Sequence, residues 1–530
     1  MRNKYYSLIA VMFMMAFGFT ACQQVKTSSS PPNILFCIAD DASFPHMGAY
    51  GTQWVNTPGF DRVAKEGLLF MKCYTPNAKC APSRSSLLTG RNSWQLEQAA
   101  NHWPHFPTKF KTYVEVLGEN GYFTGFTGKG WGPGRAVTAD GSPRALAGPA
   151  FQEHTLTPPT GKISPKDYFK NFLDFLDQSP DDQPWCFWYG GHEPHRAYEY
   201  GSGVQVGHKS MESIDQVPEF WPDTDTVRND MLDYALELEY FDQQLSKMLA
   251  ELEARGQLDN TIVVVTADNG MPFPRIKAQE YEMSNHLPLA IMWPQGISHP
   301  GRRVDDFVSF IDFAPTFLEV AGVDWQASGM KSTPGSSLTD IFAGESDGIN
   351  NPERNFVVFG KERHDVGRPD DAGYPIRGII KRDYLYVKNY HPERWPAGNP
   401  ETGYLATDGG ATKSEILRMR RQGVDASYWQ WNFGKRPAEE LYNISEDPAC
   451  MNNLVEDPAV ADYLTSLRAQ LETVLQRQQD PRVLGQGDIF QTYEYSDENS
   501  RNFYHRYMAG EELNAGWVEP SDFETEPIED

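Results

Sequence analysis

Asn33-Ile34-Leu35-Phe36-Cys37-Ile38-Ala39 runs directly into Asp40-Asp41 and is the stretch that best indicates the fold. A continuous apolar run of this kind is typical of a strand that is buried on both faces of a parallel sheet. The pattern recurs at Ile262–Thr266 (IVVVT), which leads into Ala267-Asp268-Asn269-Gly270. Ligand sites in open α/β sheets gather at the carboxyl ends of the strands. We therefore expect the two acidic pairs to meet in one site.

A long amphipathic helix supports this α/β reading. Between Val227 and Arg255 apolar residues recur every three or four positions, and Gly256 supplies a stop. Strand-like and helix-like segments alternate up to about residue 345, which is an α/β pattern. This part of the chain, residues 33–374, is predicted to form the larger domain.

The pattern changes further along the chain. Short strand-like segments at 376–380 and 384–387 precede a helix-like segment at about 459–476. This suits a smaller α+β domain. We assign residues 375–530 to it, including the last residues of the sequence. The residues from about Val483 are polar, acidic and aromatic. They form either a packed extension or a tail.

Length and charge limit the number of domains and the kinds of partner. The chain has 530 residues and a formal net charge of −25, so it can hold two or three domains. The acidic balance argues against nucleic acid as a partner. It does not exclude an anionic substrate, because screening confines fields to roughly 8–10 Å at physiological salt.

The first residues resemble an export signal. Arg2 and Lys4 precede an apolar stretch from Tyr5 to Phe19, and Thr20-Ala21-Cys22 follows. This is similar to a bacterial lipoprotein signal over residues 1–22, in which Cys22 is acylated, and the stretch is too short for a comfortable membrane span. Phe19 replaces the usual Leu, so plain signal-peptidase cleavage stays open. Residues 23–32 suit a tether, and the expected location is the periplasm or the surface of a bacterial outer membrane, with membrane contact only through the lipid.

A second motif is Cys80-Ala81-Pro82-Ser83-Arg84, continued by Leu88-Thr89-Gly90-Arg91. Pro82 fits the first turn of a helix that Gly90 would stop. Cys80 would then lie at the helix N-terminus, where free N–H groups favour an anion. Arg84 follows about one turn later and can make charge-assisted hydrogen bonds. A buried cysteine before an ordinary helix is the simpler alternative, but it does not account for this combination of residues.

The acidic pairs suggest a metal. A hard divalent cation prefers carboxylate and amide oxygens, and Asp40, Asp41, Asp268 and Asn269 supply such a set without His or Cys. The set favours calcium over zinc, with magnesium as the second candidate. Each pair alone is a weak signal, since Asp-Asn-Gly is usually a turn.

Together these motifs resemble the type I sulfatases, whose signature is C-x-P-S-R followed by T-G-R. The resemblance implies an alkaline-phosphatase-like α/β fold with a large mixed sheet flanked by helices, and a smaller C-terminal α+β domain with an antiparallel sheet. It also implies that a maturase oxidises Cys80 to formylglycine, whose hydrate is the nucleophile. The implied metal ligands are Asp40, Asp41, residue 80, Asp268 and Asn269.

Other positions follow the family's order. Lys129 in Gly128-Lys129-Gly130, His195 in Glu193-Pro194-His195-Arg196, and Lys277 match family motifs. The resemblance implies that Arg84 holds the hydrate, that Lys129 and Lys277 neutralise sulfate, and that His195 protonates the leaving group.

One position departs from the family. Trp131 replaces the histidine that normally follows the lysine by two residues and helps to eliminate sulfate from the covalent intermediate. Three interpretations are open: His102 or His105 substitutes for it, the subfamily works without it, or the protein is a weak or inactive relative.

Within the family, Ala39–Asp41, His192–Arg196 and Asp268–Pro274 resemble the heparan N-sulfatase branch. The implied substrate is N-sulfoglucosamine at the non-reducing end of heparan or heparin fragments. The candidate sugar contacts are His102, His105, Glu362, Arg363, His364 and Asp365. The alternatives are an exo-acting O-sulfatase on another sulfated glycan, a phosphoesterase of the alkaline phosphatase superfamily, and a glycan-binding lipoprotein without catalysis.

Overall fold

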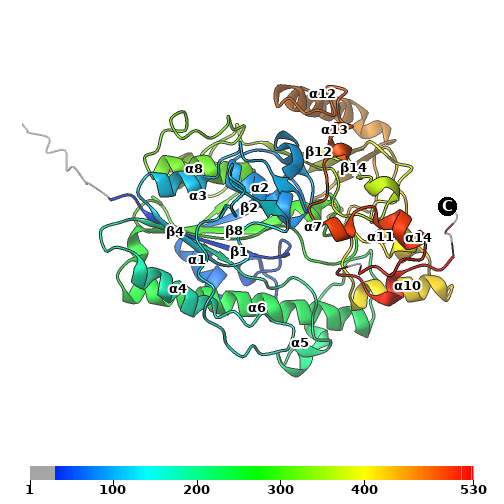
Figure 1. Cartoon of the computed structure of the whole chain (residues 1–530), viewed down its shortest axis with the longest axis horizontal. Helices are drawn as coiled ribbons and strands as arrows, with labels where there is room; N and C mark the ends of the chain where they lie inside the picture. Colours follow the sequence, from blue (N-terminus) through cyan, green and yellow to red (C-terminus); the bar gives the residue numbers. More distant parts are fainter. Residues whose placement is uncertain (1–29, 515, 527, 529–530) are drawn as a thin grey trace, which may run out of the picture. The chain divides into compact units, whose positions relative to one another are not determined.

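The main sheet carries β1 (Asn33–Ala39) at its centre, with strand order β10-β2-β8-β7-β1-β6-β4 and β9 paired to β2. This computed structural model describes residues 30–514, 516–526 and 528, so the predictions for residues 1–22 and Cys22 lie outside the described residues. β1 pairs in parallel with β6 and β7, whereas β8 is antiparallel to β7. The predicted large mixed sheet is therefore confirmed (Figure 1). The other strands are β2 (Leu68–Tyr74), β4 (Phe123–Gly128), β6 (Trp185–Gly190), β7 (Thr261–Ala267), β8 (His286–Met292), β9 (Arg302–Val304) and β10 (Val308–Ser309).

The register of the two central strands brings the acidic pairs together. β1 and β7 pair along their whole length, from Asn33 opposite Thr261 to Ala39 opposite Ala267. Both strands therefore end at the same level of the sheet. The Asp268 backbone N–H donates to the Ala39 carbonyl oxygen at 3.1 Å, and the Asp41 N–H donates to Asp268 Oδ1 at 3.0 Å.

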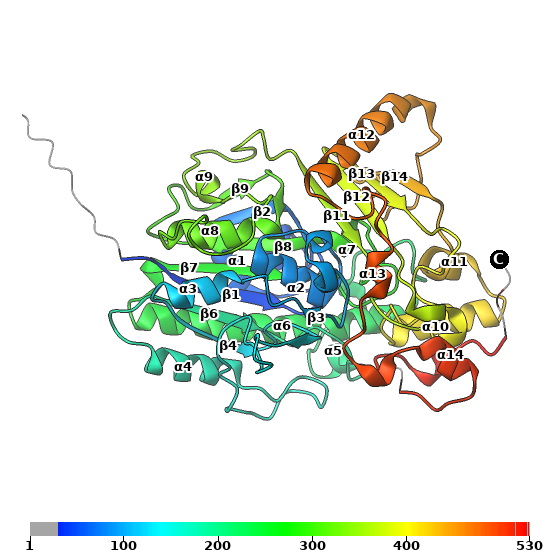
Figure 2. The ribbon, with the colours of Figure 1, turned by 45° about the horizontal axis from the view of Figure 1, so that its top comes forward.

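Helices cover both faces of the main sheet (Figures 1 and 2). Because side chains alternate along a strand, Leu35 and Cys37 pack into one apolar cluster and Ile34 and Phe36 into the other. The first cluster includes α1 (Pro58–Glu66), α4 (Tyr168–Gln178) and α6 (Asp225–Ala254), and the second includes α2 (Cys80–Thr89), α3 (Tyr113–Glu119) and α8 (Phe313–Val320).

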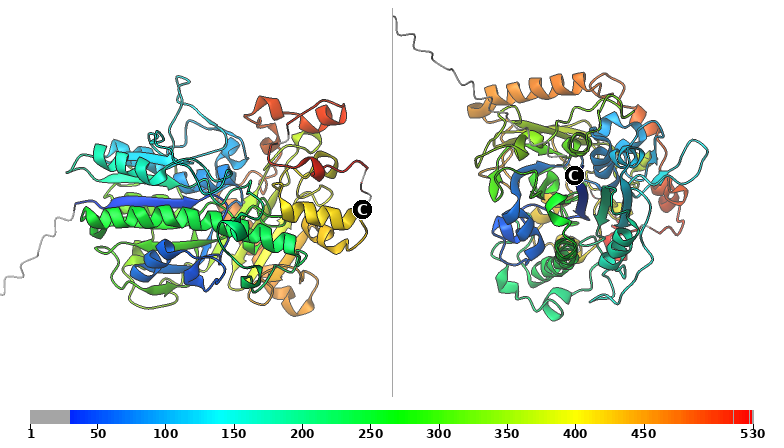
Figure 3. Two further views of the ribbon diagram at one scale, coloured as in Figure 1. Left: turned by 90° about the horizontal axis from the view of Figure 1, so that it is seen from below. Right: turned by 90° about the vertical axis from the view of Figure 1, so that its left-hand side faces the viewer.

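Helix α6 is one long helix that runs along the molecule (Figure 3). Its buried residues confirm the predicted amphipathic stripe. Thr224 caps its N-terminus by accepting a hydrogen bond from the Val227 N–H. Leu238, Leu245 and Leu252 are fully buried against the sheet. As expected, the stripe is core packing.

A smaller antiparallel sheet follows in the sequence. Its order is β11 (Phe356–Lys361), β12 (Ile376–Lys381), β13 (Tyr384–Asn389) and β14 (Glu439–Asn443). Helix α12 (Ala461–Arg477) packs on one face through Leu464, Leu467 and Leu471. The two predicted strands and the predicted helix are present, but β11 begins before residue 375, so the small sheet starts earlier than the boundary that we placed there. The chain from Pro31 onward forms one compact unit, and its division into two domains stays a prediction.

The end of the chain packs back onto the rest. Phe490, Tyr495 and Phe503 are buried, and Asp522 forms a buried ion pair with Lys413 at 3.0 Å. The described part of this segment is therefore a packed extension. The remaining elements are β3 (His105–Phe106), β5 (Arg135–Ala136), α5 (Ser202–Gln205), α7 (Glu282–Asn285), α9 (Thr339–Phe342), α10 (Ala411–Arg421), α11 (Ser427–Phe433), α13 (Ile489–Thr492) and α14 (Phe503–Met508). Among the described residues, no helix has the length and apolar character that crossing a bilayer requires.

Candidate active site

Helix α2 begins at Cys80, as the sequence predicted, and ends before Gly90, whose φ of 66° is left-handed. All of its residues are buried, so α2 is embedded at the edge of the sheet instead of lying on the surface. Ser83 fixes it there, because its Oγ donates to the Asp268 carbonyl oxygen at 2.5 Å and accepts from Thr75 Oγ1 at 2.8 Å. The start of the helix is thereby tied to the end of β7.

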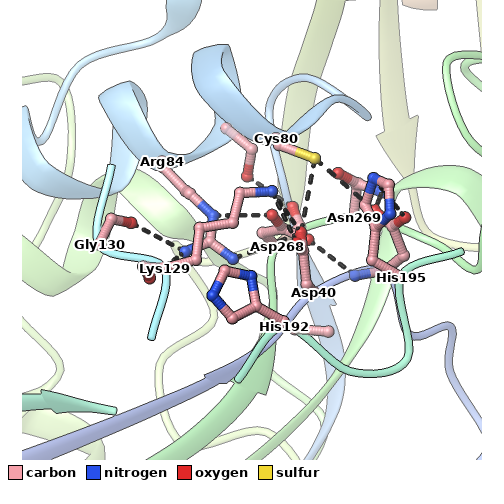
Figure 4. Close-up of polar contacts among 12 residues, drawn as sticks. Asp40, Cys80, Arg84, Lys129, Gly130, His192, His195, Asp268 and Asn269 are labelled. Carbon is pink, nitrogen blue, oxygen red and sulfur yellow. Dashed lines mark hydrogen bonds and ion pairs between the residues drawn. The ribbon is translucent and has the colours of Figure 1, made fainter. Parts of the chain in front are cut away.

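A buried cluster of potential metal ligands lies at this point (Figure 4). One ligand atom from each of Asp40, Asp41, Cys80 and Asp268 lies within 4.8 Å of the others. Asn269 donates its side-chain N–H to Asp41 Oδ1 at 2.8 Å. Its Oδ1 is buried without a hydrogen-bond partner among the described residues. Three carboxylates and an orphaned amide oxygen fit a hard divalent cation.

Three cations balance these carboxylates. Arg84 Nε lies 2.8 Å from Asp268 Oδ2, Lys129 Nζ lies 2.7 Å from Asp40 Oδ2, and Lys277 Nζ lies 2.6 Å from Asp41 Oδ2. Burial opposes the charge of Lys129, but Asp40 outweighs it, so the pKa of Lys129 is raised above its ordinary value. Burial raises the pKa of Asp268 to about 6 even with Arg84 beside it. The site therefore holds its charges as compensated pairs.

Two histidines face the cluster from different sides (Figure 4). His195 Nδ1 lies 2.5 Å from the Arg196 carbonyl oxygen, so Nδ1 carries the hydrogen and Nε2 points toward Asp41 Oδ2 at 3.7 Å. Arg196 fixes this segment through two 2.7 Å bonds to the Asp230 carboxylate. His192 lies beside Lys129 and Arg84, away from Asn269.

A cavity of ≈ 1050 Å³ opens onto these residues. Asp40, Cys80, Lys129, His195 and Lys277 line one part of it. The C-terminal segment lines another part, from Tyr495 to Trp517. A cavity of this size, with convergent charged groups at one end, is typical of a small-molecule site.

The comparisons agree with this geometry. The family model described as Sulfatase matches residues 32–323. The chain belongs to the sulfatase family. It is 28% identical over 484 residues to N-sulphoglucosamine sulphohydrolase of Homo sapiens, covering 86% of this chain and 91% of the relative. It is 27% identical over 474 residues to an ulvan-active sulfatase of Formosa agariphila, covering 83% of this chain and 74% of that relative.

Solved structures show the same fold. A protein in complex with its substrate D-glucosamine-2-N,6-O-disulfate has a TM-score of 0.59 at 19% identity, covering 85% of this chain and 99% of that one. A 2-O GAG sulfatase has a TM-score of 0.60 at 19% identity, covering 86% and 94%. The predicted family, fold class and enzyme class are therefore confirmed.

In this sulfatase, Trp131 has a structural partner. Its Nε1 donates to Ser85 Oγ on α2 at 2.8 Å, and its ring packs edge-on against Phe106 at 5.3 Å. The indole thus ties the segment after β4 to α2. Tryptophan is a donor only, so it cannot act as a base where the family histidine does.

Two of the six candidate sugar contacts line the cavity of the sulfatase, namely His102 and Asp365. His102 Nδ1 lies 3.1 Å from Asp365 Oδ1. Asp365 also pairs with Lys79 Nζ at 2.8 Å and accepts from the Tyr495 hydroxyl at 3.1 Å. These residues form one polar wall next to Cys80.

The other four candidates are not among the described lining residues. Glu362 forms buried ion pairs with Arg377 and Arg482, so its carboxylate is already used to balance two buried guanidinium groups. The remaining three contact other parts of the chain. Arg363 donates to the Tyr493 carbonyl oxygen at 2.8 Å, and His364 Nε2 lies 2.7 Å from Asn77 Oδ1. His105 lies in β3. The structure therefore corrects the expectation that the whole 362–365 run faces the substrate.

Sequence reasoning missed several lining residues of the sulfatase. Asp408 pairs with Lys277 at 2.6 Å, but Asp-Gly-Gly at this point is typical of an ordinary turn. Lys79 is buried. Of these residues, it alone could have been suspected from the sequence, because it directly precedes Cys80. Tyr495 and Trp517 could not be found, because only the folded chain brings residues so distant in the sequence to Cys80.

Proposed function

We propose that this sulfatase hydrolyses sulfate from sulfated glycosaminoglycan sugars, with N-sulfoglucosamine at the non-reducing end of heparan or heparin fragments as the first candidate. The observation that carries the proposal is the position of Cys80. It begins α2 beside a buried cluster of three carboxylates, and Arg84, Lys129 and Lys277 surround it. The human relative named for N-sulphoglucosamine, similar over most of both chains, supports the substrate class.

Cys80 is proposed to act as formylglycine, made from it by a maturase. Burial, with Asp268 nearby, raises the pKa of the Cys80 thiol well above its ordinary value. A thiol with a raised pKa is a poor nucleophile, because the thiolate is the reactive form. Conversion to an aldehyde that hydrates places two hydroxyl groups on one carbon, so that one can attack sulfur and the other can later expel sulfate.

Asp40, Asp41, Asp268, Asn269 and residue 80 are proposed to hold a divalent cation. Their oxygens favour Ca²⁺, with Mg²⁺ as the second candidate. Such an ion supplies Lewis-acid stabilisation of a sulfate oxygen. The orphaned Asn269 Oδ1 supports its binding here.

In the first step, one hydroxyl oxygen of the formylglycine hydrate attacks sulfur, and the bond from sulfur to the leaving group breaks. The proton of the attacking hydroxyl passes to a carboxylate of the cluster, for which Asp268 with its raised pKa is the first candidate. Arg84 balances the charge around the hydrate, and Lys129 and Lys277 balance that of the sulfate. His195 gives a proton to the leaving nitrogen or oxygen. Burial and Lys277 lower the pKa of His195, and a bound sulfate would offset the charge of Lys277 and favour the protonated form.

In the second step, His192 is proposed to act in place of the absent family histidine. The remaining hydroxyl of the intermediate loses its proton to His192, the carbonyl reforms, and the carbon–oxygen bond to sulfate breaks. Burial lowers the pKa of His192 to about 4, so it is neutral at pH 7 and can accept the proton. His192 lines the cavity beside Lys129, whereas His105 does not line it and His102 is bonded to Asp365.

The His192→Ala change tests this role. We expect kcat to fall about 100-fold, with a burst of desulfated sugar equal to the amount of enzyme, because the first step is intact. His105→Ala is the matched control and should keep kcat. A lowered kcat without any burst would place His192 in the first step instead.

An exo-acting O-sulfatase on another sulfated glycan is the second candidate. The Formosa relative, named as ulvan-active, is nearly as similar as the human one, so identity alone does not select the sugar. The family match leaves the phosphoesterase alternative without support. Acylation of Cys22 and a location in the periplasm or at the surface of a bacterial outer membrane remain proposals that rest on the sequence.

The test is sulfate release from glucosamine mono- and disaccharides that each carry one N-, 6-O-, 3-O- or 2-O-sulfate. Mass spectrometry of the Cys80 peptide first establishes conversion to formylglycine. We expect release from the N-sulfated sugars, loss of release after chelation, and fuller recovery with calcium than with magnesium. Release only from an O-sulfate would favour the second candidate. Binding without release by converted protein would indicate a glycan-binding lipoprotein.

A further inference from the structure

We propose that Trp517 is a sugar-binding residue, whose indole packs against the pyranose ring that carries the sulfate. This inference rests on the proposed function and extends it to the C-terminal segment of the chain. Trp517 lines the same cavity as Cys80 and His195. It lies outside residues 32–323, which the family model matches.

The backbone around Trp517 is held firmly. The Gly409 N–H donates to the Trp517 carbonyl oxygen at 2.5 Å, next to Asp408, which pairs with Lys277. Five residues later the buried Asp522 pairs with Lys413, and both side chains have 0% exposure. The segment that carries the indole is therefore fixed at Trp517 to the loop beside Asp408 and, five residues later, to α10.

The indole itself is open. Trp517 is 60% exposed, whereas Trp103 and Trp131, which also line the cavity, pack against apolar clusters. An exposed aromatic face that lines a ligand cavity is a surface on which an apolar part of a ligand can pack. A substrate in the cavity would cover this face.

The position of His195 indicates which sugar would lie there. The Trp517 and His195 rings are 5.0 Å apart between centroids and meet edge to face at 64°. The atom that His195 protonates is bonded to the sugar that loses sulfate. That sugar must therefore lie within a few ångströms of the indole. The apolar C–H face of a pyranose fits an aromatic ring, while its hydroxyls remain free for polar groups.

The experiment uses the full-length protein. Binding of glucosamine N-sulfate and of inorganic sulfate is measured by calorimetry in the Cys80→Ala background, with and without Trp517→Ala. We expect Trp517→Ala to weaken sugar binding about tenfold and to leave inorganic sulfate binding unchanged. In the active protein the same change should raise KM about tenfold with kcat within about twofold, and Trp517→Phe should lose less because it keeps an aromatic face.

Val424→Ala is the matched control, since Val424 is 63% exposed and lies outside the cavity. Equal sugar binding with and without Trp517, or a loss confined to kcat, would overturn the inference and leave the proposed function standing. Failure of the Cys80→Ala protein to bind either ligand, together with no sulfate release by the converted active protein, would overturn the proposed function and the inference together. An equal loss for sugar and inorganic sulfate would show that Trp517 acts only by positioning His195, which also contradicts the inference.

Discussion

Sulfate release is expected to fall on the order of 10⁶-fold in kcat when Cys80 is replaced by alanine, the scale on which removal of a covalent nucleophile acts. Among the described residues, the cluster directly around residue 80 consists of carboxylates and cations and offers no hydroxyl in the position of the Cys80 side chain. Alanine keeps the Cβ, and α2 stays tied to β7 through Ser83. The fold should therefore persist, as circular dichroism and the unfolding midpoint would show.

Cys186→Ala is the control for this experiment. Cys186 is also a free, buried thiol, but it lies within β6 and not in the cavity. It should keep kcat despite some loss of packing. Substantial residual turnover by the Cys80→Ala protein would refute the formylglycine mechanism, whatever the substrate.

The largest loss of stability is expected from Arg377→Met. Arg377 is fully buried, makes two bonds of 2.7 and 2.9 Å to Asp480, and lies 2.7 Å from Glu362. Without it, Asp480 is left as a buried carboxylate without its ion-pair partner. Breaking one side of a buried ion pair costs about 3–5 kcal/mol, so the free energy of unfolding should fall by that amount in denaturant titrations.

Arg418→Met provides the comparison. The Arg418 side chain is 49% exposed in its pair with Glu415, so this change should lower the free energy of unfolding only slightly.

Glu362→Gln distinguishes the two interpretations of Glu362, as part of the Arg377 network or as a sugar contact. It should reduce stability and leave KM unchanged, because Glu362 belongs to the Arg377 network and does not line the cavity. A raised KM at unchanged stability would restore Glu362 as a sugar contact.

Local patterns were sufficient to predict the central strands, the helix that begins at Cys80 and the meeting of the acidic residues. The apolar runs at β1 and β7 and the glycine after α2 determine where these elements end, and parallel pairing then brings Asp40 and Asp268 together. Glu362 and Asp365 belong to the same charged run, yet only Asp365 reaches the cavity. The difference depends on Arg377 and Arg482, and nothing in the local sequence reveals such distant partners.

The docked C-terminal segment has a consequence for how much of the chain a complete cavity needs. The three sheets, α2 and the acidic cluster come from residues before 444, whereas Tyr495 and Trp517 come later in the chain. A chain that stops near residue 480 would contain every sulfatase motif and still lack one wall of its cavity. For this protein, the segment beyond residue 480 matters as much to the proposed substrate capture as the signature around residue 80 does to the proposed chemistry.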